Sequence, residues 1–227
     1  MSEKPIDCIW LWDETAPRSP SVSMGVDEAL TNLVPYPVLR IYRWSIPCIS
    51  MGYFTPFDSV RAAARSMPII RRWTGGGVVT HGEDLPFSLV VPRTHPFSTL
   101  RPAESYLAIH NALLDALRIQ SPLIAHRLTL SKGLTDIRSS SCFDNPVPHD
   151  ILFDGNKVAG GGQKRTRKAF LHQGSLQISA DQHPTPAILA SAMSNKVEPF
   201  TPGAELLCQA EELARCRYST LEWSNKF

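Results

Sequence analysis

The chain of 227 residues has few cysteines, and they form no recognisable disulfide or metal pattern. Their number is odd, and none belongs to a Cys-x-x-Cys pair: Cys8, Cys48, Cys142, Cys208 and Cys216. A disulfide framework or a zinc site is therefore not expected. A reducing compartment fits this cysteine usage.

Long apolar runs and an excess of one charge are also missing. No segment approaches the ~20 apolar residues that a membrane helix needs, and the N-terminus, with Glu3 and Asp7, shows no signal peptide. The 23 basic and 21 acidic residues leave a net charge of +2. That balance argues against nucleic acid or a membrane surface as an obligatory partner. These features predict a cytoplasmic protein.

Linkers and repeats are absent as well. The hydrophobic content of 43% suffices for one large core or two modest ones, and no stretch between the ends has the composition of a linker. No internal repeat or low-complexity tract is present. We therefore predict one domain over residues 1–227.

The apolar pattern predicts a mixture of strands and helices. Strands are expected over 6–12, 38–44, 48–53, 68–70, 85–91, 150–153, 157–159 and 170–178. Helical spacing is found over 22–33, 58–65, 103–117, 185–192 and 204–217. Residues 45–47 are expected to join the second and third strands as a hairpin, and residues 128–148 to form a long loop.

The most informative motif is a triglycine segment with two arginines before it and a histidine after it. It reads Arg71-Arg72-Trp73-Thr74-Gly75-Gly76-Gly77-Val78-Val79-Thr80-His81. Glycines let the backbone approach a ligand closely, and the cationic groups suit a phosphate or carboxylate. The spacing excludes a Walker loop and a Gly-x-Gly-x-x-Gly turn. An anionic acyl or nucleotide ligand is one interpretation, and a flexible hairpin turn is the other.

A second triglycine segment follows a lysine. Lys157 lies on a short predicted strand just ahead of Gly160, Gly161, Gly162 and Gln163. A lone lysine there is ordinarily a surface residue whose stem packs on the sheet. Glycine in a strand lowers stability unless a close backbone approach needs it, so both triglycine segments are candidates to face one site.

Cys142 is the cysteine with a suspected chemical role, because it lies in an irregular segment rather than in a strand or helix pattern. A free thiol has a pKa of about 8.5, so a nucleophilic thiol at neutral pH needs positive charge nearby. Lys157, His149 and His81 are candidates for that charge. His172 alternates with apolar residues, which is typical of a strand histidine in the core.

Three motifs in this order and spacing resemble the lipoate-protein ligase and octanoyltransferase family, the biotin/lipoate protein ligase catalytic domain. They are Arg71-Arg72-x-Thr74-Gly75-Gly76-Gly77-x-Val79-x-His81, Lys157-Val158-x-Gly160-x-x-Gln163 and Leu171-His172-Gln173-Gly174-Ser175. The family's N-terminal helix and first hairpin are similar to Met24-x-x-Asp27-Glu28-Ala29 and Leu39-Arg40-x-Tyr42-x-Trp44. The resemblance covers roughly residues 5–200. It implies an α+β fold with a mixed, largely antiparallel central sheet flanked by helices, and an acyl tunnel between the glycine segments.

The resemblance also implies the site residues. Lys157 and the first glycine segment are expected to bind the activated acyl group, and no metal ligand is expected. The substrate-binding residues are predicted to be Arg71, Arg72, Gly75, Gly76, Gly77, His81, Gly160, Gly161, Gly162, Gln163, His172 and Gly174.

The family contains two chemistries. Ligases activate lipoate with ATP and Mg²⁺ as an acyl-adenylate, whereas transferases take octanoyl from acyl carrier protein, hold it on a cysteine and need no cofactor. Cys142-Phe143 resembles the thioester cysteine of the cysteine-loop octanoyltransferases. Two positions depart from these transferases, which often carry Arg at the position of Gly77 and usually Ser/Ala-Ala at Gly161-Gly162. The resemblance implies a single catalytic domain over residues 1–227, without the C-terminal accessory domain that many ligases use for adenylation. In a ligase, a separately encoded accessory subunit would supply that domain.

The resemblance therefore predicts an octanoyl-acyl carrier protein:protein octanoyltransferase with Cys142 and Lys157 as catalytic residues. The implied acceptors are lipoyl domains, namely the glycine cleavage H protein and the E2 subunits of 2-oxoacid dehydrogenases. An ATP-dependent lipoate-protein ligase is the alternative. A non-catalytic module that binds lipoyl domains or an acyl group is a second alternative.

Overall fold

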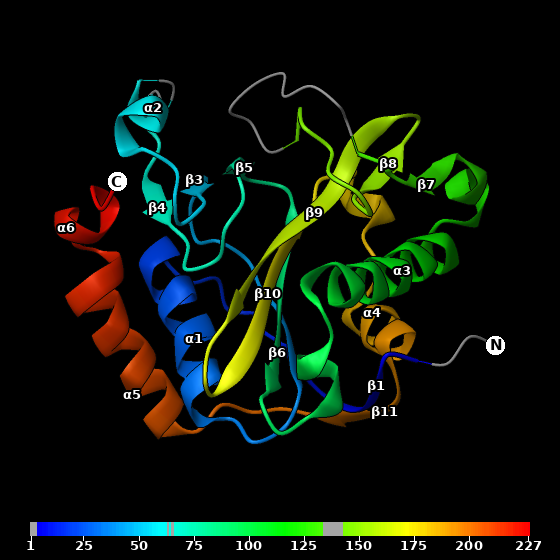
Figure 1. The fold of residues 1–227 in the computed structure, drawn as a ribbon, viewed down its shortest axis with the longest axis horizontal. Helices are drawn as coiled ribbons and strands as arrows, with labels where there is room; N and C mark the ends of the chain where they lie inside the picture. Colours follow the sequence, from blue (N-terminus) through cyan, green and yellow to red (C-terminus); the bar gives the residue numbers. More distant parts are fainter. Residues whose placement is uncertain (1–3, 63, 65, 134–142) are drawn as a thin grey trace.

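The computed structural model describes residues 4–62, 64, 66–133 and 143–227, and within them a mixed central sheet (Figure 1). Its strand order is β11–β1–β2–β6–β10–β9–β8–β7. Strand β1 is parallel to both of its neighbours, and the other pairs are antiparallel. The predicted mixed, largely antiparallel sheet is confirmed. The strands are β1 (Ile6–Asp13), β2 (Val38–Ile41), β6 (Leu85–Pro92), β7 (Leu128–Leu130), β8 (Ile151–Phe153), β9 (Asn156–Arg165), β10 (Ala169–Leu176) and β11 (Ser194–Pro199).

A smaller sheet contains β3 (Cys48–Met51) between β4 (Ile69–Arg71) and β5 (Val78–His81). The predicted hairpin between residues 38–44 and 48–53 is wrong, because β2 pairs with β1 and β6 while β3 pairs with β4 and β5. Strands β2 and β3 are both buried along their whole length. Without an alternating polar face, their sequences do not specify a pairing partner.

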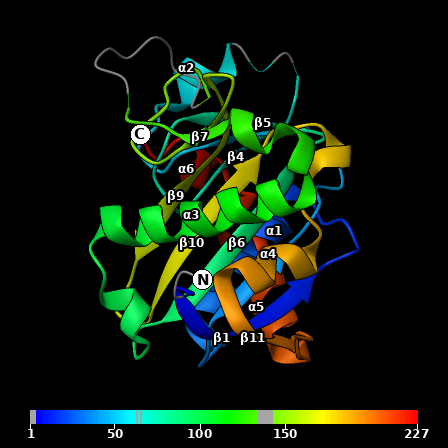
Figure 2. The ribbon, with the colours of Figure 1, turned by 90° about the vertical axis from the view of Figure 1, so that its right-hand side faces the viewer.

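Helices cover both faces of the central sheet (Figures 1 and 2). Helices α1 (Pro20–Leu33) and α5 (Ala204–Leu213) lie on one face, and α3 (Pro102–Gln120) and α4 (Pro186–Met193) on the other. Two short helices, α2 (Phe57–Arg61) and α6 (Leu221–Ser224), lie beside the small sheet. Among the described residues, no helix is long and apolar enough to span a membrane.

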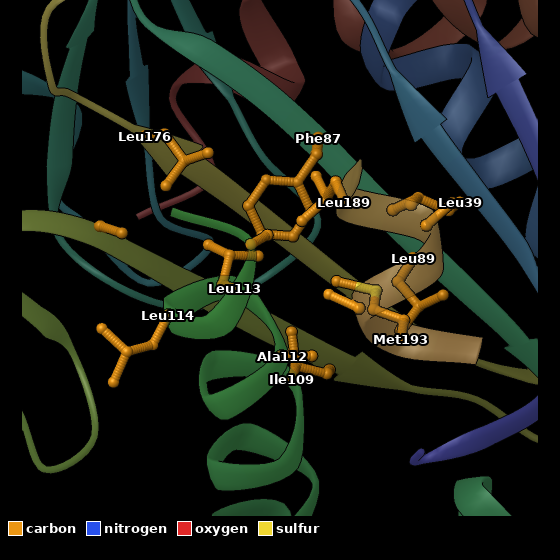
Figure 3. Packing of buried hydrophobic residues seen from close by; sticks show 14 of the residues in the cluster. Leu39, Phe87, Leu89, Ile109, Ala112, Leu113, Leu114, Leu176, Leu189 and Met193 are labelled. Atoms are coloured by element: carbon orange, nitrogen blue, oxygen red, sulfur yellow. The ribbon is translucent and has the colours of Figure 1, made fainter. Parts of the chain in front are cut away.

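The core against α3 shows why this helix forms where its apolar spacing predicts it (Figure 3). Ile109 and Leu113 of α3 are buried against Phe87 and Leu89 of β6, with Met193 of α4 in the same cluster. Neighbours at helical spacing share one face, and alternate strand residues share one side of a sheet. The predicted packing of this helix on the sheet is confirmed.

Candidate active site

A pocket lies between the small sheet and strands β9 and β10. Residues of the small sheet form one wall, and paired residues of β9 and β10 form the other. The lining residues are Tyr42, Trp44, Ser50, Arg72, Gly76, Val79, His81, Phe143, Gly160, Gly161, Gly162, Gln173, Gly174 and Ser175. Both triglycine segments therefore contribute to one pocket.

The small sheet carries a hydrogen-bonded row of polar side chains along the pocket. Ser50 Oγ lies 2.6 Å from His81 Nε2, and Arg72 Nη1 donates to Ser50 Oγ over 2.6 Å. Ser50 is opposite Val79 in the β3–β5 register, so its side chain shares a face with that of His81. All three polar side chains are buried, and all three line the pocket.

Asp84 anchors this row at its far end. His81 Nδ1 lies 2.6 Å from Asp84 Oδ2, which also accepts a hydrogen bond from Ser175 Oγ at 2.7 Å. The Gly82 N–H donates to the other carboxylate oxygen over 3.1 Å. Burial alone would raise the pKa of Asp84, but these hydrogen bonds, with that from His81 foremost, hold its pKa below the ordinary value. Asp84 is therefore an ionised acceptor at neutral pH.

The first triglycine segment is fixed by backbone contacts. Arg72 Nη2 donates to the carbonyls of Gly75 and Gly77 at 3.3 and 3.0 Å. Gly76 has a φ of 104°, in the region that favours glycine. The Gly52 N–H donates to the Gly77 carbonyl over 3.2 Å, and a Cβ on Gly52 would overlap the Gly76 carbonyl. The flexible hairpin turn was one of two interpretations of this segment, and these contacts hold the segment in place.

A chain of buried polar groups ties the same segment to the core. Thr74 Oγ1 donates to Gln173 Oε1 over 2.8 Å, and Gln173 Nε2 donates to Asp27 Oδ2 over 2.7 Å. Asp27 on α1 also accepts a hydrogen bond from Arg40 Nη1 over 2.7 Å. Burial opposes the charge of Arg40, and Asp27 and Glu14 outweigh it, so the pKa of Arg40 is raised.

The second triglycine segment lies inside β9, which continues to Arg165 rather than ending at residue 159 as predicted. Gly160, Gly161 and Gly162 pair with residues of β10. A Cβ at these positions would overlap the Lys157 side chain, the His172 ring and the Gly75 carbonyl, respectively. The segment therefore lacks side chains because other groups of the chain pack against it. Through Gly162, the two triglycine segments touch backbone to backbone.

Lys157 lies against Gly160 in a buried ion pair. Its Nζ is 2.8 Å from Asp150 Oδ2, and both side chains are almost fully buried. Tyr106 on α3 donates to the other oxygen of Asp150 over 2.5 Å and accepts from the Gly161 N–H at 3.0 Å. Gly160, Gly161 and Gly162 form one wall of the pocket, which we call the glycine wall. The ammonium group is therefore fixed next to this wall.

Six of the predicted residues that the structure describes are not among those that line the pocket: Arg71, Gly75, Gly77, Lys157, Gln163 and His172. Arg71 points to the opposite side of β4 from Arg72, and its guanidinium donates to the backbone carbonyls of residues 52, 53, 55, 223 and 224. Burial lowers the pKa of Arg71. The Gln163 amide contacts Ser105 of α3. These two side chains are part of the scaffold around the pocket.

His172 lies behind the glycine wall, together with a second buried histidine. Its ring is 5.7 Å from Phe87 and 5.6 Å from His110, and Tyr106 stacks on His110 at 4.0 Å. Burial lowers the pKa of His172 to about 3 and that of His110 well below its ordinary value. Both imidazoles are neutral at physiological pH.

These neutral histidines predict a loss of stability in mild acid. The unfolded chain binds a proton at His172 below pH ~6.5, whereas the folded chain does not until about pH 3. Stability is therefore lost as the pH falls through this window, by about 2 kcal/mol from His172 alone between pH 7 and pH 5. Urea unfolding at both pH values measures it.

Replacement of His172 by leucine should make the loss of unfolding free energy between pH 7 and pH 5 smaller by about 2 kcal/mol. The matched control is His126→Gln at an exposed histidine, which should leave the difference unchanged. An equal pH dependence of His172→Leu and the parent protein would contradict the assignment.

The predicted nucleophile Cys142 lies outside the described residues. Its neighbour Phe143 is described and lines the pocket, and Lys157 Nζ is 5.2 Å from the centre of the Phe143 ring. Among residues 4–62, 64, 66–133 and 143–227, no group of three or more His, Cys, Asp or Glu side chains could hold a metal ion.

Sequence reasoning missed Ser50 and Asp84. Ser50 lies in a short apolar strand, where a lone serine gives no functional signal. Asp84 follows His81 by three residues in a turn, and this spacing was the available hint. Ser175 was part of a motif but was not predicted to belong to the site.

The fold brings a triglycine segment held by Arg72 opposite a glycine-rich strand, against which the buried Lys157 packs. The family model described as the lipoyl protein ligase A/B catalytic domain matches residues 19–207. The chain belongs to this family.

Relatives agree with this membership, and solved structures agree with the fold. The octanoyltransferase LipM of Macrococcus caseolyticus is 33% identical over 184 residues, covering 76% of this chain and 67% of its own length. That of Brevibacillus brevis is 28% identical over 272 residues, covering 95% and 98%. Among solved structures, a lipoate-protein ligase A bound with ATP superposes with a TM-score of 0.70 at 20% identity, covering 97% and 98% of the two chains. At that identity the structure supports the fold alone.

Proposed function

We propose that this chain is an octanoyltransferase that acylates a lysine of lipoyl domains. Relatives named octanoyltransferase LipM support the activity, at up to 33% identity. The observation that carries the proposal is the buried Lys157–Asp150 pair, because it fixes a cation against Gly160, which lines the pocket. We also propose acyl carrier protein as the octanoyl donor and the cytoplasm as the location.

The reaction begins at Cys142. The thiolate attacks the octanoyl thioester, the bond from the carbonyl carbon to the donor sulfur breaks, and the octanoyl group becomes bound to Cys142. In the second step the amine of the acceptor lysine attacks the same carbonyl carbon, and the Cys142 sulfur leaves. The acyl group arrives activated, so this route uses no nucleotide.

Lys157 stabilises the charge that develops on the carbonyl oxygen in both steps. Its ammonium group is held by Asp150 and cannot swing into solvent without leaving that carboxylate buried. Preorganised donors of this kind act strongly because they need no rearrangement during the reaction. Gly76 of the first triglycine segment lines the same pocket.

The test is intact mass spectrometry of the purified chain after incubation with octanoyl-acyl carrier protein in the absence of ATP. An octanoyl adduct that maps to Cys142, and that is absent from Cys142→Ser, is the expected result. When a lipoyl domain is then added, the enzyme should lose the octanoyl adduct and the lipoyl domain should gain the mass of one octanoyl group.

The ATP-dependent ligase gives a different pattern in this experiment. No adduct would form, and the lipoyl domain would gain mass only with lipoate and ATP, equally with Cys142→Ser. No mass gain under either condition would favour the non-catalytic module.

A further inference from the structure

The row of side chains on the small sheet has the geometry of a proton relay. Ser50 Oγ, the His81 ring and the Asp84 carboxylate follow one another at 2.6 Å each. An ionised Asp84 only accepts hydrogen bonds, so His81 donates to it from Nδ1. In the neutral imidazole the lone pair is then at Nε2, and Ser50 Oγ donates its hydrogen to it.

This row ends in the pocket. Ser50 and His81 both line it, and Ser50 Oγ accepts one hydrogen bond, from Arg72, leaving a second lone pair. Asp84 is buried and is held by Ser175 and Gly82 besides His81. A serine, histidine and carboxylate in this order transfer a proton from the serine end to the histidine while the carboxylate stabilises the imidazolium.

The proposed function creates a need for such a group. A lysine amine is protonated at neutral pH, with a pKa of about 10.4, and it must lose protons before it is a neutral amide nitrogen. Lys157 Nζ lies 2.8 Å from Asp150 Oδ2 in a buried ion pair, where it acts as a hydrogen-bond donor. The row formed by Ser50, His81 and Asp84 offers a proton acceptor on the lining of the pocket.

We propose that Ser50, His81 and Asp84 take up the proton of the acceptor lysine as its amine attacks the acyl group. The inference rests on the proposed acyl transfer, and it holds for a thioester and for an acyl-adenylate alike. The acceptor ammonium group first releases one proton to solvent. As the neutral amine forms the new N–C bond, one of its two remaining protons moves to Ser50 Oγ and the Ser50 proton moves to His81 Nε2. The bond from the acyl carbon to its carrier breaks with its electron pair, and His81 later releases the proton to solvent.

The surroundings of the relay are defined. The Trp44 ring lies 4.8 Å from the His81 ring, and Arg72 is the cation that contacts Ser50. Among the described residues whose pKa is shifted, Tyr42, Cys48 and His183 also interact electrostatically with Asp84. Burial raises the pKa of Tyr42 and of Cys48, and burial lowers that of His183, so all three are neutral at pH 7.

The test is a single-turnover measurement with the full chain. Enzyme preloaded with octanoyl is mixed with a lipoyl domain, and transfer is timed by mass spectrometry from pH 6.5 to pH 9.5 for the parent, His81→Gln and Asp84→Asn. We expect both variants to transfer about 100-fold more slowly at pH 7, the lower end of general-base effects. Their rates should rise about tenfold per pH unit as more acceptor amine is deprotonated, and imidazole should rescue His81→Ala.

A matched control separates the relay from a general effect of losing a histidine. His95 also contacts a carboxylate, Asp7, at 2.8 Å, but away from the pocket, and His95→Gln should transfer at the parent rate. The relay is overturned if the variants transfer within threefold of the parent, or if neither high pH nor imidazole restores them. Circular dichroism verifies that each variant is folded.

The experiment also distinguishes failure of the relay from failure of the proposed donor. If the parent does not load octanoyl from acyl carrier protein, octanoyl-adenylate serves as the donor for the same three proteins. A parent that transfers from the adenylate, with variants that recover at high pH, supports the relay and rejects the thioester route. Equal rates for parent and variants with either donor reject the relay alone.

Discussion

Replacement of Lys157 by alanine is expected to lower octanoyl transfer by at least 100-fold. The ammonium group is fixed beside the glycine wall, 2.8 Å from Asp150, and removal of one such oxyanion donor typically costs about 10²–10³ in kcat. The loss should appear in kcat more than in KM, because the interaction strengthens as charge develops on the carbonyl oxygen. Steady-state transfer to a lipoyl domain measures both constants.

The same substitution leaves the Asp150 carboxylate buried without its cation. Breaking a buried ion pair on one side costs about 3–5 kcal/mol, so Lys157→Ala alone is expected to be less stable. The double variant Lys157→Ala, Asp150→Asn removes both charges and should recover most of that stability. If activity returns together with stability, Lys157 has a structural role and the catalytic assignment fails.

Replacement of Gly162 by alanine is the second large effect that we expect. The new Cβ would overlap the Gly75 carbonyl and come within 3.1 Å of Thr74 Oγ1. Neither β9 nor the clamped glycine segment can move freely, so we expect a loss of about 2–3 kcal/mol from overpacking. Transfer activity should fall more than tenfold, because the two walls of the pocket are forced apart. Chemical unfolding and activity assays on one preparation measure the two effects.

Gly203→Ala is the matched control for this substitution. Gly203 precedes α5, and a Cβ there has no neighbour within 4 Å. Activity of this variant should stay close to that of the parent, and its stability should fall by no more than about 1 kcal/mol, because Gly203 is the N-cap of α5. If Gly162→Ala behaves like Gly203→Ala, the backbone contact between the two triglycine segments does not shape the pocket.

The order of strands and helices was predictable because most elements carry their own periodicity. Helix α3, for example, begins and ends within a few residues of its predicted bounds, and its apolar face packs where expected. Pairing was harder to predict. Strands β2 and β3 are both short and buried throughout, so their sequences give no reason to place them in different sheets.

The site was predictable where the chain shows unusual residues and not where it shows ordinary ones. Glycine triplets, Arg72 and His81 are conspicuous in the sequence, and the structure gathers them around one pocket. The direction of a side chain cannot be read from composition. Arg71 and Arg72 are chemically identical neighbours, yet strand alternation sends one guanidinium to carbonyls of the C-terminal turn and the other to Ser50.

This alternation means that the end of β4 joins two distant parts of the molecule. Arg71 donates to the carbonyls of Trp223 and Ser224, and the indole N–H of Trp223 donates back to the Arg71 carbonyl over 3.0 Å. The next residue, Arg72, holds the triglycine carbonyls. Helix α6 is therefore hydrogen-bonded to the residue directly before Arg72, on the side of β4 that faces away from the pocket. A protease cut or a bulky fusion near residue 221 would displace Arg71. Because Arg72 is the next residue, that displacement would alter the pocket without any contact with the substrate.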